Sequence, residues 1–102
     1  MNKMAPDTKP KTIYITGASG RLGNEVMRRL PEATPLVRSE SGIQNAIVTD
    51  FSQMQLKGIL NDADVIVHLA GSIDTTDGRK LQESNVELTR RIVEAAPEDC
   101  RI

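Results

Sequence analysis

Hydrophobic residues gather in four short runs along the chain. Short apolar runs rich in β-branched residues are typical of strands that a parallel sheet buries on both faces. The runs predict strands over residues 13–15, 34–37, 46–48 and 65–69. The third strand is the hardest to place, because a crossover between parallel neighbours usually takes about a dozen residues or more. The turn-rich connection before it, residues 39–45, is shorter than that.

The segments between these runs show helical periodicity. Leu22, Val26 and Leu30 fall four apart and predict a first helix. A Ser-x-x-Gln capping pattern at Ser52 predicts the start of a second helix, and a third is predicted over residues 80–96. Helices that alternate with strands in this way indicate an α/β fold with a parallel sheet.

Composition narrows the class of protein. The 102 residues allow one small domain, with residues 1–11 expected to be a disordered arm and residues 12–102 to form the fold. The 13 basic and 14 acidic residues leave no basic footprint for nucleic acid and no polybasic membrane patch. No apolar run is long enough for a signal peptide or a membrane span. A single cysteine, Cys100, fits a reducing compartment, so we expect a cytoplasmic protein.

A glycine-rich turn separates the first predicted strand from the first helix. Gly17 is expected to turn the chain sharply with a positive φ, Gly20 to let the backbone approach a pyrophosphate, and Gly23 to let the helix pack closely. The helix then begins with free N–H groups and the positive end of its dipole, and both attract an anion. An ordinary flexible turn is the alternative, but the flanking strand and helix favour dinucleotide binding. The expected contacts to the cofactor come from Gly17, Ser19, Gly20, Arg21, Leu22 and Gly23.

Arg38 and Ser39, which end the second strand, bear on the choice between NAD and NADP. An NAD-preferring site places an acidic residue about 20 residues after the first glycine, where it binds the ribose hydroxyls. A guanidinium instead suits the 2′-phosphate of NADP through charge-assisted hydrogen bonds, so the sequence favours NADP over NAD. Two alternatives stay open: Arg38 is a solvated charge at a strand end, or Glu40 lies near the ribose and NAD is preferred.

Three further polar residues each have a structural and a functional interpretation. Asp50 follows the third strand, where it is either an acid at a helix start or a ligand contact. His68 lies in an apolar strand with no second ligand at metal spacing, so we expect a hydrogen-bonded interior residue and no metal site. Asn85 lies on the apolar stripe of the last helix, where its amide is hydrogen-bonded to backbone or helps to order an active site.

These motifs together resemble the extended short-chain dehydrogenase/reductase family, in its NAD(P)-dependent epimerase/dehydratase branch. The residues that carry the resemblance are Thr16–Gly23, Asp50-Phe51, Val65–Gly71 and Asn85-Val86. The resemblance implies the first half of a Rossmann-type doubly wound parallel sheet, with strand order 3-2-1-4 and a fifth strand opening at the C-terminus. It also implies that Asp50 contacts the adenine amino group and that Phe51 packs on the adenine ring. The ligand crevice would lie between strands one and four, beside Leu69, Ala70 and Gly71.

Enzymes of this family work with a Tyr-x-x-x-Lys pair, and the sequence lacks it, because its one tyrosine, Tyr14, is followed four residues later by Ala18. The resemblance therefore implies the cofactor-binding, N-terminal part of a nucleotide-sugar epimerase, dehydratase or reductase that is inactive alone, with Asn85 as an accessory residue. A nucleotide-sugar substrate is expected only for a full-length parent, and the resemblance allows a homodimer of that parent. Two alternatives stay open: a non-catalytic module that senses NADP(H), and a truncated reading frame.

Overall fold

The strands and helices follow the predicted order. The computed structural model describes residues 11–18, 20–39, 42–69 and 78–102, with side chains in the last range from Asn85 onward. The elements are β1 (Ile13–Thr16), α1 (Arg21–Arg29), β2 (Thr34–Val37), β3 (Ile47–Val48), α2 (Gln53–Leu60), β4 (Val65–His68) and α3 (Gly78–Ala95). All the strand pairs are parallel and the sheet has the order β3-β2-β1-β4, which confirms the predicted fold class and strand order. Most of the predicted arm, residues 1–10, lies outside the described residues.

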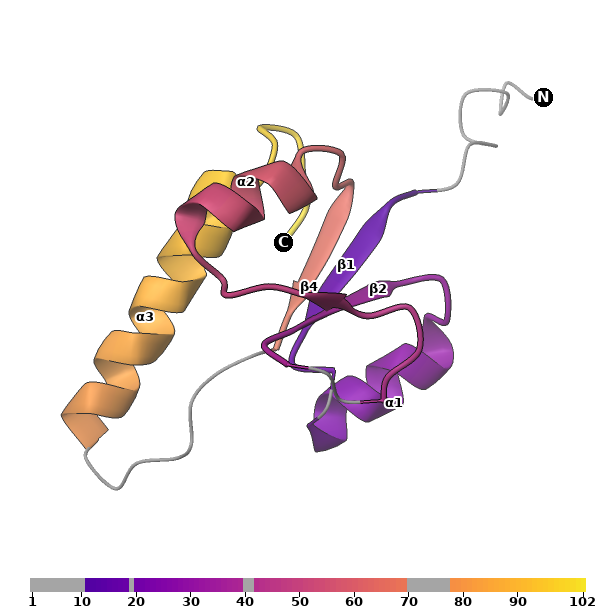
Figure 1. Ribbon diagram of the computed structural model, residues 1–102, viewed down its shortest axis with the longest axis horizontal. Coiled ribbons are helices and arrows are strands. Elements are labelled where there is room, and N and C mark those ends of the chain that lie inside the picture. The colour runs from indigo at the N-terminus through magenta and orange to yellow at the C-terminus, as the bar shows by residue number, and fades with distance from the viewer. Residues whose placement is uncertain (1–10, 19, 40–41, 70–77) are drawn as a thin grey trace.

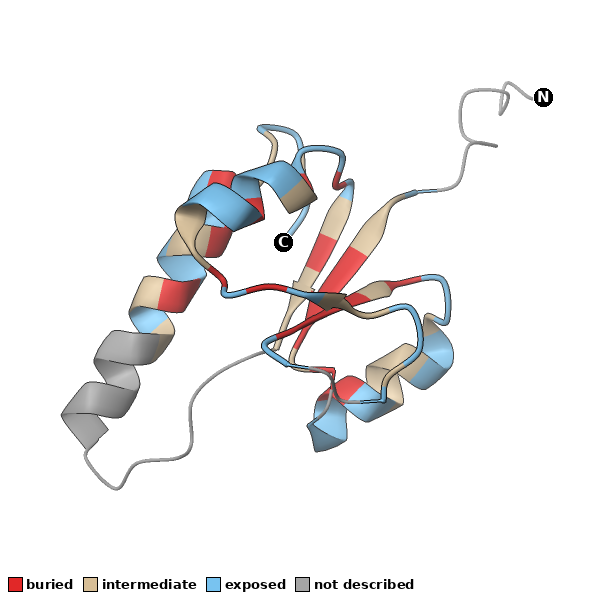
Figure 2. Ribbon diagram, in the orientation of Figure 1, coloured by how far each residue is buried: buried red, intermediate tan, exposed pale blue. Residues whose placement is uncertain are grey.

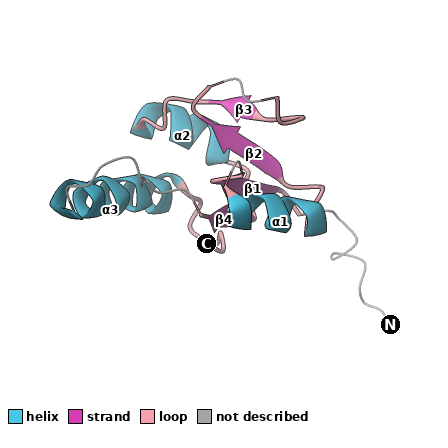
Figure 3. Ribbon diagram, turned by 90° about the horizontal axis from the view of Figure 1, so that it is seen from below, coloured by secondary structure: helices cyan, strands magenta, loops and turns pink. Residues whose placement is uncertain are grey.

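Helices cover both faces of the sheet (Figures 1 and 3). One face carries α1, and the other carries α2 and α3, which contact each other. Side chains of the central strands alternate between these layers: Tyr14 and Ile66 pack with Ile92 under α2 and α3, whereas Ile15 packs with Ala33 under α1. The buried residues accordingly lie along the strands and on the inward sides of the helices (Figure 2). Burial on both faces explains why the strands read as continuous apolar runs.

The short connection to β3 is a loop, and two residues at positive φ let it return within a few residues. Gly42 has φ 79° and Asn45 has φ 65°, a region that glycine and asparagine enter more readily than other residues. The pairing that results is brief, with Leu36 opposite Ile47 and Val37 opposite Val48. A crossover without a helix is sufficient here because β3 is an edge strand of only two residues.

The C-terminus begins a fifth strand on the free side of β4, as predicted. Arg101 forms a parallel bridge with Val65. The Ile66 N–H donates to the Arg101 carbonyl at 2.7 Å, and the Arg101 N–H donates to the Asp64 carbonyl at 3.0 Å. The sheet is therefore extended beyond β4 by the last residues of the chain.

Leu22 departs from the apolar stripe that its spacing predicts. It is 62 % exposed, whereas Val26, Met27 and Leu30 pack toward the sheet. The face of α1 that meets the sheet runs through Gly23, which is buried. Consecutive residues of a helix are turned by roughly 100°, so a helix that directs Gly23 at the sheet turns Leu22 away from it. The spacing thus predicted the helix correctly, and the exposed position of Leu22 at the helix start leaves its expected contact with a cofactor a prediction.

Candidate functional site

The carboxyl ends of the strands meet at one edge of the sheet (Figure 1). Thr16 is paired with Leu36 on one side and with His68 on the other, and the Thr49 N–H donates to the Val37 carbonyl at 2.8 Å. The connections that open at this edge contain the glycine turn 17–23, Arg38-Ser39, Asp50-Phe51 and Leu69. Open α/β sheets bind their ligands at this edge. The fold thus gathers there the predicted site segments that it describes; Ser19, Ala70 and Gly71 lie outside the described residues.

The glycines of the turn differ in what the protein's own packing requires of them. Gly17 has φ 81°, as predicted for a sharp turn out of β1. A Cβ on Gly23 would lie 1.9 Å from the Gly17 carbonyl oxygen, so close packing of helix on strand requires glycine there. A Cβ on Gly20 would lie 3.5 Å from that same oxygen, which is an ordinary contact. Packing among the described residues therefore does not require glycine at position 20. A ligand that approaches the backbone closely would require it.

In the first turn of α1, the described residues provide no side-chain cap for the N–H groups. Its N-cap residue is Gly20, no side chain caps it, and the turn contains no acidic residue. Arg21, the first residue of the helix, and Leu22 are both exposed. The charge of Arg21 is unfavourable at the positive end of the helix dipole, by about 0.3–1 kcal/mol. An anion bound there would be attracted both by the dipole and by Arg21. The helix start therefore has the features of an anion site.

Arg38 leaves the end of β2 and lies over the ring of Phe51. The guanidinium carbon is 4.9 Å from the ring centroid, within the range of a cation–π contact. Phe51 itself is 3 % exposed and belongs to the core under α2 and α3. The guanidinium of Arg38, which is exposed, therefore presents more surface to a ligand here than the phenyl ring does. Ser39 beside it is exposed as well.

The turn that carries Asp50 and Phe51 is held by a dense set of hydrogen bonds. Phe51 has φ 60°, which is strained for an aromatic residue, at a cost of about 1–3 kcal/mol. Its N–H donates to Thr49 Oγ1 at 3.1 Å. The Gln55 Oε1 atom accepts from Thr49 Oγ1 at 2.7 Å and from the Asp50 N–H at 2.9 Å. These bonds over-determine the backbone of the turn, and this is how a strained φ persists.

Asp50 helps to start α2 and keeps part of its carboxylate available. Its Oδ1 atom accepts the Ser52 N–H at 2.8 Å, and that hydrogen bond is the main cause that lowers its pKa. The Oδ2 atom makes no hydrogen bond with any residue of the described ranges. Ser52 accepts the Gln55 N–H, as its capping pattern predicts, but the Gln55 side chain bonds to Asp50 and Thr49 instead of reaching back to Ser52. The structural interpretation of Asp50 is thus visible, and the free oxygen leaves room for the functional one.

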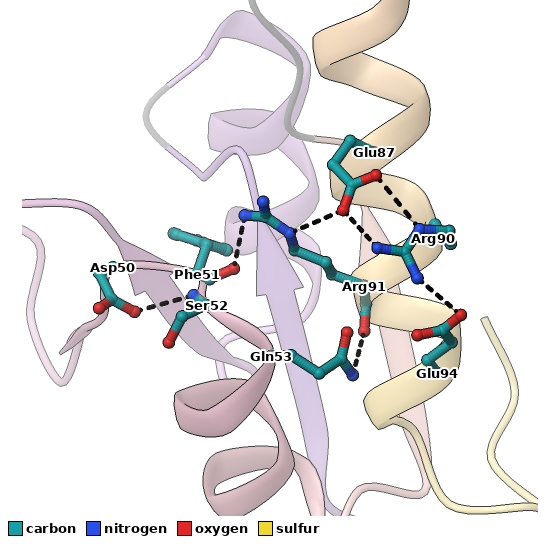
Figure 4. A network of polar contacts seen from close by, with 8 residues as sticks. All are labelled: Asp50, Phe51, Ser52, Gln53, Glu87, Arg90, Arg91 and Glu94. Carbon is teal, nitrogen blue, oxygen red and sulfur yellow. Dashed lines mark hydrogen bonds and ion pairs between the residues drawn. The ribbon is translucent and has the colours of Figure 1, made fainter.

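Arg91 of α3 fixes the same turn from the opposite side (Figure 4). Its Nη1 donates to the Phe51 carbonyl at 3.3 Å, and its Nε donates to Glu87 at 3.1 Å. The side chain of Gln53 donates to the Arg91 carbonyl at 3.3 Å. Arg91 was not among the predicted site residues. The sequence signal for it is Glu87, four residues earlier on the helix, which predicts an ion pair but no contact with the turn.

His68 joins β4 to β1 and α3 through both nitrogens of its ring. Thr89 donates its hydroxyl to the Asn85 carbonyl at 2.9 Å, so it accepts from His68 Nε2 at 3.1 Å, and His68 Nδ1 then accepts from Thr16 Oγ1 at 2.7 Å. The Leu69 N–H donates to Thr16 Oγ1 at 3.1 Å. Burial lowers the pKa of His68, which favours the neutral ring over the cation, and the hydrogen bonds then place its proton on Nε2. The ring is hydrogen-bonded inside the fold, as predicted, and the described residues contain no cluster of metal-ligating side chains.

Asn85 is half-buried on the inward side of α3, one turn before the buried Leu88. An open hollow of about 410 Å³ is lined by Asn85, Val86, Thr89 and Arg90. The side chain of Leu81, on the other side of Asn85 in the predicted stripe, lies outside the described residues. The backbone carbonyl of Asn85 accepts from Thr89, which also contacts His68 of β4, and the accessory role of the Asn85 side chain stays a prediction.

The chain is similar to a known protein family and to several solved structures. A profile of the NAD dependent epimerase/dehydratase family matches residues 13–101. The structure is similar to that of UDP-N-acetylglucosamine 4-epimerase from Bacillus cereus, with a TM-score of 0.74 and 28% identity over 84% of this chain and 31% of the epimerase. It is also similar to a point mutant of uronate dehydrogenase from Agrobacterium tumefaciens complexed with NAD, with a TM-score of 0.66 and 25% identity over 83% of this chain and 36% of that one.

One sequence match is to a much longer protein. The hybrid PKS-NRPS synthetase gkaA of Penicillium citrinum is 26% identical over 114 aligned residues, which cover 89% of this chain and 3% of the synthetase. The chain thus spans about a third of the two structures and a small part of this relative. Among the helices in the described ranges, none has the length and apolar character needed to cross a membrane.

Proposed function

Since the chain belongs to the NAD dependent epimerase/dehydratase family, we propose that it forms the dinucleotide-binding portion of a nucleotide-sugar epimerase, dehydratase or reductase. The observation that carries the proposal is the start of α1, where the helix has no side-chain cap and no acid in its first turn. Backbone N–H groups at a helix start bind a pyrophosphate by hydrogen bonds and by the helix dipole. Gly20 supports this, because its missing Cβ leaves room for a ligand and serves no packing within the described protein.

The remaining site segments fit the other parts of a dinucleotide. Arg38 and the free Oδ2 of Asp50 lie at the ends of β2 and β3, where the adenosine end would bind. Leu69 follows β4 on the other side of the glycine turn, where the nicotinamide end would bind. A bound nicotinamide supplies the hydride acceptor or donor for the reaction, and the described residues bind and orient it. The NAD in the uronate dehydrogenase complex is consistent with this assignment.

Tyr14 is unsuited to the role of the family's catalytic tyrosine. Its hydroxyl donates to Asp62 Oδ1 at 2.8 Å, in the turn directly after α2. Burial, together with that hydrogen bond, raises the pKa of Tyr14 to about 12. A general acid–base needs a pKa near the working pH. We therefore propose that the chain is inactive alone and that a Tyr-x-x-x-Lys pair of the complete protein performs the chemistry, with Asn85 as an accessory residue.

The substitution Gly20→Ala tests the proposed pyrophosphate site. Gly20 has φ −79° and ψ 172°, which alanine adopts without strain, so the fold should tolerate the methyl group. We expect the Kd for both NAD and NADP to rise by at least about tenfold, because hydrogen bonds to a charged phosphate are lost. Isothermal titration calorimetry of the complete protein measures it. The control is Gly58→Ala, at a position where a Cβ meets nothing within 4 Å.

Two results would refute the pyrophosphate site. One is the absence of dinucleotide binding by the unmodified complete protein. The other is a folded Gly20→Ala variant that binds the dinucleotides as tightly as Gly58→Ala and the unmodified protein do. A variant with lower affinity and an unchanged melting temperature supports the proposal.

We also propose that the site prefers NADP over NAD through Arg38. The exposed guanidinium suits a 2′-phosphate, and no acidic residue follows β2 directly. We expect NADP to bind about tenfold more tightly or better, and Arg38→Ala to remove this preference without weakening NAD. Arg28→Ala is the matched control, because Arg28 is an exposed arginine paired only with Glu25 of its own helix. Equal affinities for the two dinucleotides, before and after Arg38→Ala, would contradict the preference.

The rest of the proposal concerns the complete protein. We propose a nucleotide-sugar substrate, a homodimer and a cytoplasmic location for it. Turnover of UDP-sugars with NAD or NADP tests the substrate class, and a protein that binds the dinucleotide without any turnover would instead be a sensing module.

A further inference from the structure

We propose that Phe51 determines the specificity for the 2′-phosphate by holding the guanidinium of Arg38 in place, and that Arg91 in turn holds Phe51. The inference rests on the proposed function, since it explains how Arg38 would discriminate NADP from NAD. Neither Phe51 nor Arg91 needs to touch the phosphate. Both are positioning residues for Arg38.

Arg38 stacks on the ring of Phe51. Arg38 stands at an exposed strand end with its guanidinium carbon 4.9 Å from the centre of the Phe51 ring. An arginine side chain that is free in water loses rotamer freedom when it binds a phosphate, and a side chain that is already stacked loses less. The ring therefore preorganises the guanidinium for an anion. A stacked guanidinium also keeps its N–H groups at its edge, where they are available to phosphate oxygens.

The ring of Phe51 is held in the core and offers Arg38 a fixed surface. Phe51 is 3 % exposed and packs in the core with residues of α2 and α3. The core thus holds the ring in place, whereas Arg38, whose guanidinium lies over the ring, is exposed at a strand end. A phenylalanine half in solvent would give Arg38 no fixed location.

The backbone of the turn at Phe51 is strained and is held by hydrogen bonds. A φ of 60° is costly for phenylalanine, and the turn keeps it through hydrogen bonds from both sides. The N–H of Phe51 is bound by Thr49, and its carbonyl is bound by Arg91 from α3. Figure 4 shows the Arg91 side chain between the Phe51 carbonyl and Glu87. Strained backbone held in this way is typical of positions where a side chain must be aimed.

The experiment measures the ratio of the Kd for NAD to the Kd for NADP in the complete protein. Phe51→Leu removes the aromatic face and keeps an apolar residue in the core. We expect the ratio to fall by about two- to fivefold, the value of an exposed cation–π contact, and a loss of adenine packing, which NAD and NADP share, would cancel in the ratio. The pair adenosine 2′,5′-bisphosphate and 5′-AMP serves as a second probe, because its members differ only in the 2′-phosphate.

Arg91→Gln is the second variant, since Phe51→Leu also alters the core. It leaves both Arg38 and the ring in the chain and removes only the bond to the Phe51 carbonyl and the ion pair with Glu87. The ratio should fall here too. The matched control is Arg90→Gln on the same helix, which removes the same charge and ion pairs with Glu87 and Glu94 but has no contact with the turn. Its ratio should equal that of the unmodified protein.

The possible outcomes separate this inference from the proposed function. If the unmodified protein binds neither dinucleotide, or binds both equally, the proposed NADP site fails and this inference fails with it. If Arg38→Ala removes the preference while Phe51→Leu and Arg91→Gln keep the full ratio, Arg38 acts without these residues and the inference alone is overturned. When Phe51→Leu does not fold, Arg91→Gln against Arg90→Gln decides.

Discussion

Tyr14 gives a quantitative test of the packing under α2, because it is the one tyrosine of the chain and the sequence contains no tryptophan. The side chain is 7 % exposed, and its hydroxyl donates to Asp62 Oδ1 at 2.8 Å. Burial first, and then the hydrogen bond and charge of Asp62, raise the pKa of Tyr14 from 10.0 to about 12. The folded chain thus holds the phenolic proton more tightly than the unfolded chain does.

The size of the effect follows from linkage. A tenfold change in proton affinity corresponds to about 1.4 kcal/mol, so the raised pKa corresponds to at most about 3 kcal/mol of stability. Because the folded pKa is the higher one, this contribution is complete below pH 10 and is lost as the pH rises through about 12. Tyr14→Phe removes the titrating group and one hydrogen bond, which costs about 0.5–1.5 kcal/mol at neutral pH. The variant should therefore be less stable at neutral pH and the more stable of the two at high pH.

Two measurements on the 102-residue chain check this prediction. Urea unfolding of both proteins at a series of pH values gives the difference in stability, and the ultraviolet absorbance of tyrosinate follows ionisation of Tyr14 directly. A tyrosine that ionises in the folded protein at its ordinary pKa near 10 would refute the reasoning. So would a difference between the two proteins that stays constant with pH.

Two further predictions concern the glycine turn and His68. Gly23→Ala should not fold stably, because its Cβ would lie 1.9 Å from the Gly17 carbonyl oxygen. Gly58→Ala, at an open helical position, should raise the free energy of unfolding by about 0.5–1 kcal/mol. Thermal melts of both variants check this, and equal melting temperatures would contradict it. Burial lowers the pKa of His68, so its contribution to stability is present above its ordinary pKa of 6.5 and is lost as the pH falls through the lowered value. His68→Asn should lose this acid sensitivity, and a variant with the pH profile of the unmodified protein in urea unfolding would argue against a lowered pKa of His68.

The sequence predicted well those features that depend on neighbours along the chain. Gly17 adopts its positive φ and Gly23 its close packing because a turn directly after a strand requires both. Ser52 caps α2 because its partner is only three residues away. The strand order could be predicted because alternating strands and helices leave few right-handed arrangements of a parallel sheet. The spacing of Leu22, Val26 and Leu30 predicted the helix α1, but spacings of four along a short segment do not fix which of two adjacent rows faces the sheet, and Leu22 is exposed.

The contacts of the side chains at the sheet edge could not be predicted in the same way. Arg38 and Phe51 are 13 positions apart by their numbering, and Arg91 reaches the Phe51 carbonyl across 40 positions. No local pattern marks a phenylalanine at positive φ, and the bonds that hold it come partly from residues 49–55 and partly from Arg91 of another element. The turn 49–52 therefore has a conformation that its own residues disfavour and that α3 helps to impose. Since the same helix also contacts His68 through Thr89, α3 holds the backbone of the turn after β3 and the side chain at the end of β4. We infer that the position of α3, which local sequence does not determine, sets how accurately this edge of the sheet can recognise a dinucleotide.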